Sequence, residues 1–319
     1  MRLYQIYQQN YIYFPIETIK QLDITKIRHI YKNGAAFIDL FGQGVIFVYF
    51  CGIMDTGNIK DIKELLDSEA ARINSPEFIA DDPVQFPRRF ERQQDIEIIA
   101  LLSATIAWGN RKMICRNCEK LIRIFEGRPY DYVMDGAYET LPDGNIHRTF
   151  FVENLKHYLR GLRSIYSRFS TLEEMAVAEG VPADEMPAWR LVEAMNHRFA
   201  EANGGTCDSR CLPGNLRTTA LKRINMALRW LVRDDGIVDM GVWKALRPSQ
   251  LFIPMDVHVG NTSRNLGLLQ RRSNDREAVI QLTDTLRAFH PDDPVIYDYA
   301  LFGLGIGIGV ADTDAKANS

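Results

Sequence analysis

The chain lacks any uninterrupted apolar run long enough to span a bilayer, because its densest apolar stretch, Val45–Phe50, is far too short. It also lacks a strong charge of either sign: 38 Lys and Arg stand against 41 Asp and Glu, which gives a net charge of −3. The first absence excludes a membrane as a partner. The second excludes bulk positive charge as a means of holding nucleic acid, although a local basic patch would suffice.

Cysteine is scarce and odd in number, since 319 residues contain five: Cys51, Cys115, Cys118, Cys207 and Cys211. An odd count without a secretory signal indicates reduced thiols and a cytoplasmic protein. Cys115 and Cys118 are spaced like metal ligands, but they fall inside a predicted helix and not on a knuckle turn. We therefore expect buried free thiols, with no metal and no cofactor.

Residues 1–53 lack both a clean helical period and the layout of a signal peptide, and they hold nearly half of the tyrosines. From Met54 the sequence becomes charged and helix-patterned. One interpretation is that translation starts at Met54 and that residues 1–53 are not part of the native protein. The other is a poorly packed N-terminal extension. Residues 313–319 are predicted to form a disordered polar tail.

Alternating apolar and polar residues are scarce after Met54, so we predict an all-α body over residues 54–312 that forms a single domain. Apolar residues recur at helical spacing over 59–72, 96–125, 149–169, 171–179, 186–202, 216–232, 275–289 and 294–304. A glycine and an asparagine at positions 109 and 110 predict a corner that divides 96–125 into two helices. Two prolines predict a loop over 75–83.

Residues 252–259 read Phe-Ile-Pro-Met-Asp-Val-His-Val, and Arg264 and then Leu-Gly-Leu at 266–268 follow. This pattern resembles the helix-hairpin-helix base-excision DNA glycosylases, the superfamily that includes endonuclease III. Its members typically carry an apolar run, Asp-Thr-His-Val, an arginine and Leu-Gly-Leu, so Val257 replaces a threonine here. The resemblance implies a two-lobed helical fold with a cleft between the lobes, and DNA as the partner.

Two further stretches resemble the same superfamily, each with a departure. Residues 99–104 (Ile-Ala-Leu-Leu-Ser-Ala) are similar to its early helix, but the glutamine that fills the hole left by an extruded base is absent. Thr105, Trp108 or Asn110 would have to replace it. Residues 212–220 (Leu-Pro-Gly-Asn-Leu-Arg-Thr-Thr-Ala) are similar to its hairpin, with a leucine in place of the second glycine.

A closer likeness links residues 58–310 to a bacterial family of unknown function near this superfamily. The shared stretches include 86–90 (Phe-Pro-Arg-Arg-Phe), 107–112 (Ala-Trp-Gly-Asn-Arg-Lys), 228–233 (Leu-Arg-Trp-Leu-Val-Arg) and 297–301 (Tyr-Asp-Tyr-Ala-Leu). This likeness implies a fold and not an activity. No cysteine follows Asp256, so the iron–sulfur cluster of the endonuclease III group is not expected.

Asp256 is the residue that we expect to carry a glycosylase reaction. Positive charge develops on the deoxyribose as the base leaves, and a carboxylate near the anomeric carbon stabilises that charge or activates a water. The base must first be flipped out of the duplex into a pocket. The alternative is that Asp256 caps the helix that follows it, since aspartate is a good N-cap, and one aspartate can do both.

Lys222 is the second catalytic candidate, because some relatives use a lysine nucleophile that forms a Schiff base. The hairpin register places Thr218 at that lysine's position and Lys222 one helical turn further on. The alternative is a solvated lysine on an amphipathic helix.

Seven residues are candidates for nucleic-acid binding: Trp108, Asn110, Arg111, Lys112, Arg217, Arg223 and Arg229. Arginines, lysines and helix N-termini bind phosphates, and tryptophan stacks on bases. The alternatives are solvated or acid-paired cations, and a tryptophan packed in the core.

Three functions therefore compete. The first is a DNA base-excision glycosylase or a degenerate relative, with Asp256 as its carboxylate. The second is a non-catalytic nucleic-acid-binding protein on the same scaffold. The third is a small-molecule hydrolase that uses Asp256, Asp239 or Asp298. We expect the protein to be a monomer.

Overall fold

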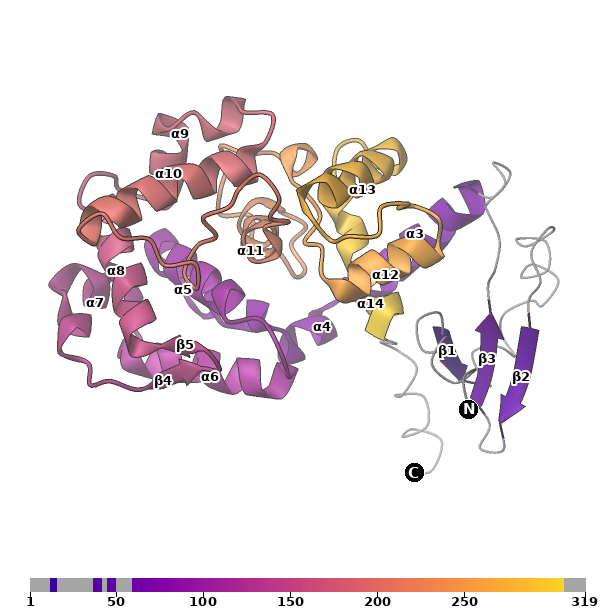
Figure 1. The fold of residues 1–319 in the computed structure, drawn as a ribbon, viewed down its shortest axis with the longest axis horizontal. Coiled ribbons are helices and arrows are strands. Elements are labelled where there is room, and N and C mark those ends of the chain that lie inside the picture. Colours follow the sequence, from indigo (N-terminus) through magenta and orange to yellow (C-terminus); the bar gives the residue numbers. More distant parts are fainter. Residues whose placement is uncertain (1–11, 16–36, 42–44, 50–58, 307–319) are drawn as a thin grey trace. The chain divides into compact units, whose positions relative to one another are not determined.

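The computed structural model describes residues 12–15, 37–41, 45–49 and 59–306 (Figure 1). The chain divides into two compact units. Unit 1 comprises Met1–Ile73, Asp256–Ser273 and Ile296–Ser319, and unit 2 comprises Asn74–Met255 and Asn274–Val295. Most described residues are helical, which confirms the expected class at this level. No described helix is long and apolar enough to cross a membrane.

The described helices of unit 1 are α3 (Ile59–Ile73), α12 (Val257–Asn265) and α14 (Tyr297–Ile306). Helix α14 packs against both of the others. The packing on α3 is close, because a Cβ at Gly303 would come within 2.0 Å of the Ile73 Cδ1 atom. The Tyr297 hydroxyl also donates to the Asp67 carboxylate at 2.6 Å. Gly303 therefore lets α14 and α3 approach each other closely. Helix α14 is the partner that the apolar side of the helix predicted over 59–72 requires.

The strands β1 (Ile12–Pro15), β2 (Phe37–Phe41) and β3 (Val45–Tyr49) form an antiparallel sheet in the order β1-β3-β2. Ile12 lies opposite Val48, and Phe37 lies opposite Tyr49. We did not predict these three strands from the sequence. Their runs of aromatic and β-branched residues favour a sheet. Met54 and the predicted tail at 313–319 lie outside the described residues.

Unit 2 contains the following described helices: α4 (Pro76–Asp81), α5 (Gln93–Thr105), α6 (Arg111–Ile124), α7 (Pro129–Asp135), α8 (Val152–Tyr166), α9 (Leu172–Ala178), α10 (Pro187–Ala202), α11 (Lys222–Val232) and α13 (Arg276–Phe289). A two-stranded hairpin joins β4 (Asn145–His147) to β5 (Phe150–Phe151). Short 3₁₀ turns lie at Pro83–Gln85, Pro87–Arg89, Ala137–Thr140, Val181–Ala183, Pro248–Gln250 and Pro294–Ile296.

Helix α5 forms the core of unit 2, and every residue from Ile96 to Thr105 is buried. Helices α6, α7 and α11 pack against it. A helix that is apolar on all sides is expected inside a fold and not on its surface. The position of α5 matters for the site below, because its C-terminal end faces the start of α11.

The corner predicted at positions 109 and 110 is confirmed, and it separates α5 from α6. Gly109 adopts a left-handed φ of 101°, and a Cβ there would lie 2.5 Å from the Arg148 Nη1 atom. Asn110 plays a different part, because its side chain accepts from the Met113 N–H at 3.2 Å and caps α6. Glycine thus makes the turn and asparagine starts the next helix.

The helices predicted over 149–169, 171–179, 186–202 and 275–289 are confirmed as α8, α9, α10 and α13. The loop predicted over 75–83 is wrong, because α4 begins at Pro76. Proline is well tolerated at the first helical position, where its missing N–H has no intrahelical acceptor to lose.

A buried carboxylate joins α5 to three other parts of unit 2: the end of α8, the start of α9 and the segment after α11. Glu97 is 0% exposed, and its oxygens accept from the Leu172 N–H at 2.9 Å, the Tyr166 hydroxyl at 3.0 Å and the Trp243 indole N–H at 2.8 Å. The Glu173 N–H and the Gln93 amide donate to it as well, each at 3.2 Å. Burial raises the pKa of Glu97, while its donors act in the opposite direction. Glu97 therefore fixes the start of α9 on the core helix.

Candidate functional site

A pocket of about 470 Å³ opens at the start of α11 in unit 2. Its lining consists of Thr105, Cys211, Pro213, Thr218, Thr219, Ala220, Leu221, Lys222, Arg223, Ile224 and Asn274. The lining therefore includes two cations and no carboxylate. It brings together the hairpin-like stretch 212–220, the predicted nucleophile Lys222 and the predicted phosphate ligand Arg223.

The stretch before α11 is not helical, although we predicted a helix from position 216. Two of its carbonyl oxygens accept hydrogen bonds from side chains distant in the sequence. The Trp189 indole donates to the Thr219 carbonyl at 3.1 Å, and the Arg276 guanidinium donates to the Leu216 carbonyl at 3.1 Å. Leu221 then takes a left-handed φ of 53°, which is costly for a branched side chain, and the helix begins at the next residue. The leading N–H groups of α11 consequently border the pocket.

Arg223 is a half-buried cation at the pocket wall. Its Nη1 atom donates to the Thr105 carbonyl at 3.2 Å and to the Arg210 carbonyl at 3.0 Å. Burial lowers the pKa of Arg223, and Tyr158 and Cys211 raise it. No carboxylate pairs with this guanidinium among the described residues. A partly buried positive charge whose hydrogen-bond acceptors in the described part of the chain are carbonyl oxygens favours an anion in the adjoining space.

Lys222 is anchored to the same corner. Its amine donates to the Ala107 carbonyl at 3.3 Å, just beyond the C-terminal end of α5. Lys222 also acts electrostatically on the buried Asp82. Burial raises the pKa of Asp82, whereas nearby cations, including Lys222, lower that pKa. The Lys222 amine is therefore directed toward the corner that follows α5.

Tyr158 lies behind the pocket wall, and we did not single it out from the sequence. It is fully buried, and its hydroxyl has no hydrogen-bond partner of normal geometry, although Thr105 lies nearby. Burial raises the pKa of Tyr158, with Thr105 and Arg223 opposing the shift. A buried hydroxyl without a partner is uncommon, and this one stands beside three residues of the pocket lining.

Trp108 is held at the α5–α6 corner by its backbone and its ring. Its carbonyl oxygen accepts from His147 Nε2 at 2.9 Å, so that nitrogen carries the proton, and His147 Nδ1 accepts from the Asn117 amide at 2.8 Å. Burial lowers the pKa of His147. The Arg148 guanidinium lies 4.4 Å from the centroid of the Trp108 ring. Trp108 is half-exposed, and Arg148 covers one face of its ring.

The other candidate cations differ in exposure. Lys112 and Arg217 are exposed, and Arg111 is half-buried with its guanidinium 3.8 Å from the Asp82 carboxylate. Arg229 is 4% exposed, and its Nε atom donates to Asp239 at 3.3 Å. Because a buried, acid-paired guanidinium is not offered to a phosphate, we remove Arg229 from the predicted nucleic-acid surface.

Asp256 belongs to unit 1, where it caps α12. Its side chain accepts from the Val259 N–H at 2.9 Å, and the residue is half-exposed at the end of the buried stretch 251–255. His258 lies in the first turn of the same helix, with its ring 6.4 Å from that of Phe302. The capping interpretation is thus confirmed. It does not decide the catalytic one, because one aspartate can both cap a helix and act on a substrate.

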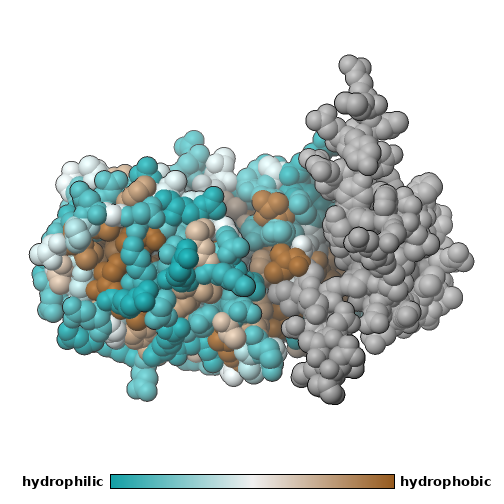
Figure 2. All heavy atoms as spheres, turned by 90° about the horizontal axis from the view of Figure 1, so that it is seen from below, coloured by the Kyte–Doolittle hydropathy of each residue, from teal (hydrophilic) through white to brown (hydrophobic). Residues whose placement is uncertain are grey.

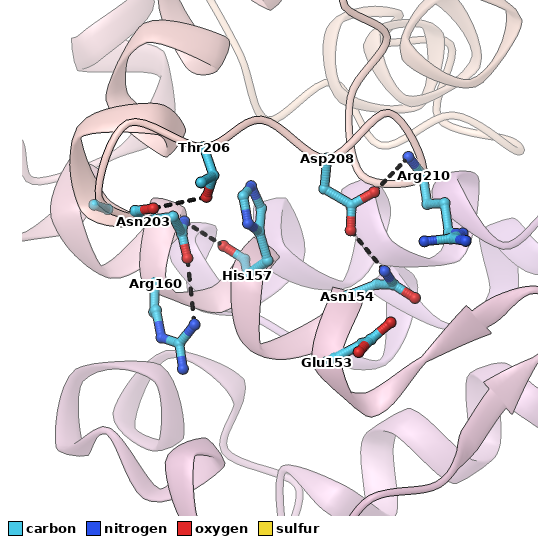
Figure 3. Close-up of a pocket in the computed structure, with 9 residues that line it drawn as sticks. Glu153, Asn154, His157, Arg160, Asn203, Thr206, Asp208 and Arg210 are labelled. Carbon is cyan, nitrogen blue, oxygen red and sulfur yellow. Dashed lines mark hydrogen bonds between the residues drawn. The ribbon is translucent and has the colours of Figure 1, made fainter.

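A second hollow of about 430 Å³ lies between α8 and the loop after α10 (Figure 3). Figure 3 shows Asn154 and His157 of α8 directed toward that loop, with Asp208 opposite them. Asp208 accepts from the Asn154 amide at 2.6 Å and from the Arg210 N–H at 2.9 Å. Burial lowers the pKa of His157. The lining of this hollow includes two acids, Glu153 and Asp208, which disfavour an anion, so it is a weaker candidate for a phosphate site than the pocket at α11.

The four cysteines that the structure describes do not gather at one place. Cys115 and Cys118 lie on α6, as expected, and Cys118 is buried, which raises the pKa of its thiol to about 12. Cys211 donates from its thiol to the Asn154 carbonyl at 3.1 Å, while Cys207 is exposed. Among the described residues, no group of three potential ligands is placed to hold a metal ion.

Comparison with known proteins identifies one family. The model of the family described as "Protein of unknown function (DUF2400)" matches residues 82–307. No curated protein and no solved structure matches the chain. The matched region includes both Asp256 and the pocket at α11. The chain therefore belongs to the DUF2400 family.

Proposed function

We propose that this protein binds DNA and releases a base from it by hydrolysing the N-glycosidic bond, with Asp256 as the carboxylate that stabilises the sugar cation or activates a water. The fold that accompanies this proposal is the two-lobed glycosylase-like arrangement. The reaction rests on the likeness of residues 252–259 to the catalytic segment of the glycosylases.

The observation that carries DNA binding is the acid-free, cationic pocket at α11. Helix N-termini favour anions through their leading N–H groups, and Arg223 adds a charge that no carboxylate of the described residues neutralises. A pocket of about 470 Å³ is within the range that holds small molecules and single nucleotides. Phosphate is the nucleic-acid group that such a wall would hold.

The first test is base release from duplexes that carry a panel of damaged bases, together with binding measured by gel shift. We expect release from at least one lesion. We also expect Arg223→Gln to weaken DNA binding and to reduce the slope of log K against log salt by about one, the loss of a single phosphate contact.

Arg168→Gln is the matched control, because Arg168 is exposed and faces Glu201 at 3.7 Å. It removes the same charge and should leave the slope unchanged. Binding without release from any lesion would support the non-catalytic nucleic-acid-binding protein. Absence of DNA affinity at low salt contradicts the proposal altogether.

Lys222 acts in this proposal as an anchor of the pocket wall and not as a nucleophile. The Lys222 amine donates to the Ala107 carbonyl at 3.3 Å, and a Schiff base would require it to leave that acceptor for the sugar. We therefore expect no covalent adduct when the protein is incubated with DNA containing an abasic site and then reduced with borohydride. A trapped adduct that disappears in Lys222→Gln would restore the nucleophilic role.

A further inference from the structure

Helix α6 carries a stripe of cations on the side opposite the core. Lys112, Arg116, Lys120 and Arg123 are spaced by four, four and three residues, which places them within an arc of about 80°. The buried residues Ile114, Cys118 and Leu121 occupy the other side of the helix. We call Lys112, Arg116, Lys120 and Arg123 the α6 stripe.

No carboxylate of the described residues pairs with the α6 stripe. The single acid of the helix, Glu119, lies at the edge of the stripe and pairs with Arg89 at 2.7 Å. Three other arginines of unit 2 do have acidic partners: Arg92 pairs with Asp131, Arg160 with Glu139 and Arg168 with Glu201. The stripe is therefore a local basic surface on a chain whose acids outnumber its bases.

A fifth cation extends this surface. The hairpin β4–β5 packs beside α6, and the Lys120 amine donates to the Asn145 carbonyl at 2.6 Å. Arg148 occupies the hairpin turn with a left-handed φ of 50°, and the Asn145 amide donates to its carbonyl at 2.6 Å. Arg148 is exposed and has no acidic partner among the described residues. Its guanidinium lies over Trp108, at the corner that begins α6.

We propose that the α6 stripe and Arg148 form a track for the sugar–phosphate backbone of duplex DNA; this inference rests on the proposed DNA binding. The stripe is about 16 Å long at 1.5 Å per residue, so its cations can meet several successive phosphates of one strand. Cations without acidic partners lose no ion pair when they meet phosphate. Figure 2, which views the molecule from the side where Figure 1 places α6, shows a largely hydrophilic surface over unit 2.

The track and the pocket are joined through the α5–α6 corner. Lys222 and Arg223 hold the carbonyls of Ala107 and Thr105 at one side of the corner, and the stripe begins at Lys112 on the other. A backbone that follows the stripe toward its N-terminal end therefore reaches Trp108, a ring suited to stacking on a base. The track supplies affinity that is independent of sequence and of damage.

The experiment measures binding to an undamaged duplex as a function of salt, for the wild type and for the fourfold variant Lys112→Gln, Arg116→Gln, Lys120→Gln, Arg123→Gln. We expect the slope of log K against log salt to fall by about three to four, at roughly 0.9 per phosphate contact. Between about 50 and 200 mM salt the wild type should lose roughly 60- to 250-fold more affinity than the variant. Single-stranded DNA and RNA of equal length should bind less tightly than the duplex.

A fourfold control with the same change in net charge uses acid-paired cations: Lys63→Gln, Arg92→Gln, Arg168→Gln and Arg190→Gln. Equal slopes for the stripe variant and the wild type would overturn the track, as would a control that loses as much as the stripe variant. So would a wild type without affinity for the undamaged duplex. Binding through the stripe without base release from any lesion would instead contradict the proposed glycosylase activity and support the proposed track.

Discussion

Replacing Asp256 by asparagine is expected to lower the rate of base release at least ~100-fold while leaving the melting temperature unchanged. The structure makes this substitution informative, because the carboxylate caps α12 by accepting from the Val259 N–H at 2.9 Å. Asparagine is an equally good N-cap and keeps that acceptor. It removes the negative charge, which is the property that the proposed reaction needs.

Two further variants separate the cap from the chemistry. Asp256→Ala removes both, so it should lose the activity and also about 1 kcal/mol of stability. Asp275→Asn repeats the same change at the cap of α13, where the side chain accepts from the Ala278 N–H at 3.1 Å, and it should retain full activity. Base release is followed on the lesion that the wild type processes, and unfolding by calorimetry. If Asp256→Asn releases bases at the wild-type rate, Asp256 is a helix cap and nothing more.

The helices could be predicted from the sequence because their apolar period is set by local geometry. The N-cap roles of Asp256 and Asp275 follow from the same local rules. The α6 stripe is visible as well, since its spacing needs only the helix to be known. We nevertheless singled out only Lys112 of its four members, because a row of cations gains meaning once the absence of nearby acids is known.

The pocket at α11 could not be predicted in the same way. Helical periodicity continues through position 216, but Trp189 and Arg276 take the carbonyls of that stretch from elements far along the chain. The positions of Arg223 and Arg229 show the same limit of prediction from the sequence. The two arginines lie six positions apart on one helix, and only tertiary packing places one against Asp239 and the other at a pocket wall.

The second large effect concerns stability and lies away from the pocket. We expect Glu97→Gln to destabilise unit 2 by about 3 kcal/mol or more, although it changes the side chain by one group. Glutamine must direct its NH₂ toward one of the two positions that the carboxylate oxygens now occupy. One position faces the Leu172 N–H, and the other faces the Glu173 N–H and the Trp243 indole N–H.

These three groups only donate, so either orientation sets an N–H against an N–H and leaves a buried donor without an acceptor. The Tyr166 hydroxyl can reverse its role, but it cannot relieve the others. Glu201→Gln, at an exposed position, is the control and should lie within about 0.5 kcal/mol of the wild type. Urea unfolding measures both. If the Glu97→Gln protein is as stable as the control, then Glu97 is protonated in the wild type, and one of its oxygens already donates a hydrogen bond.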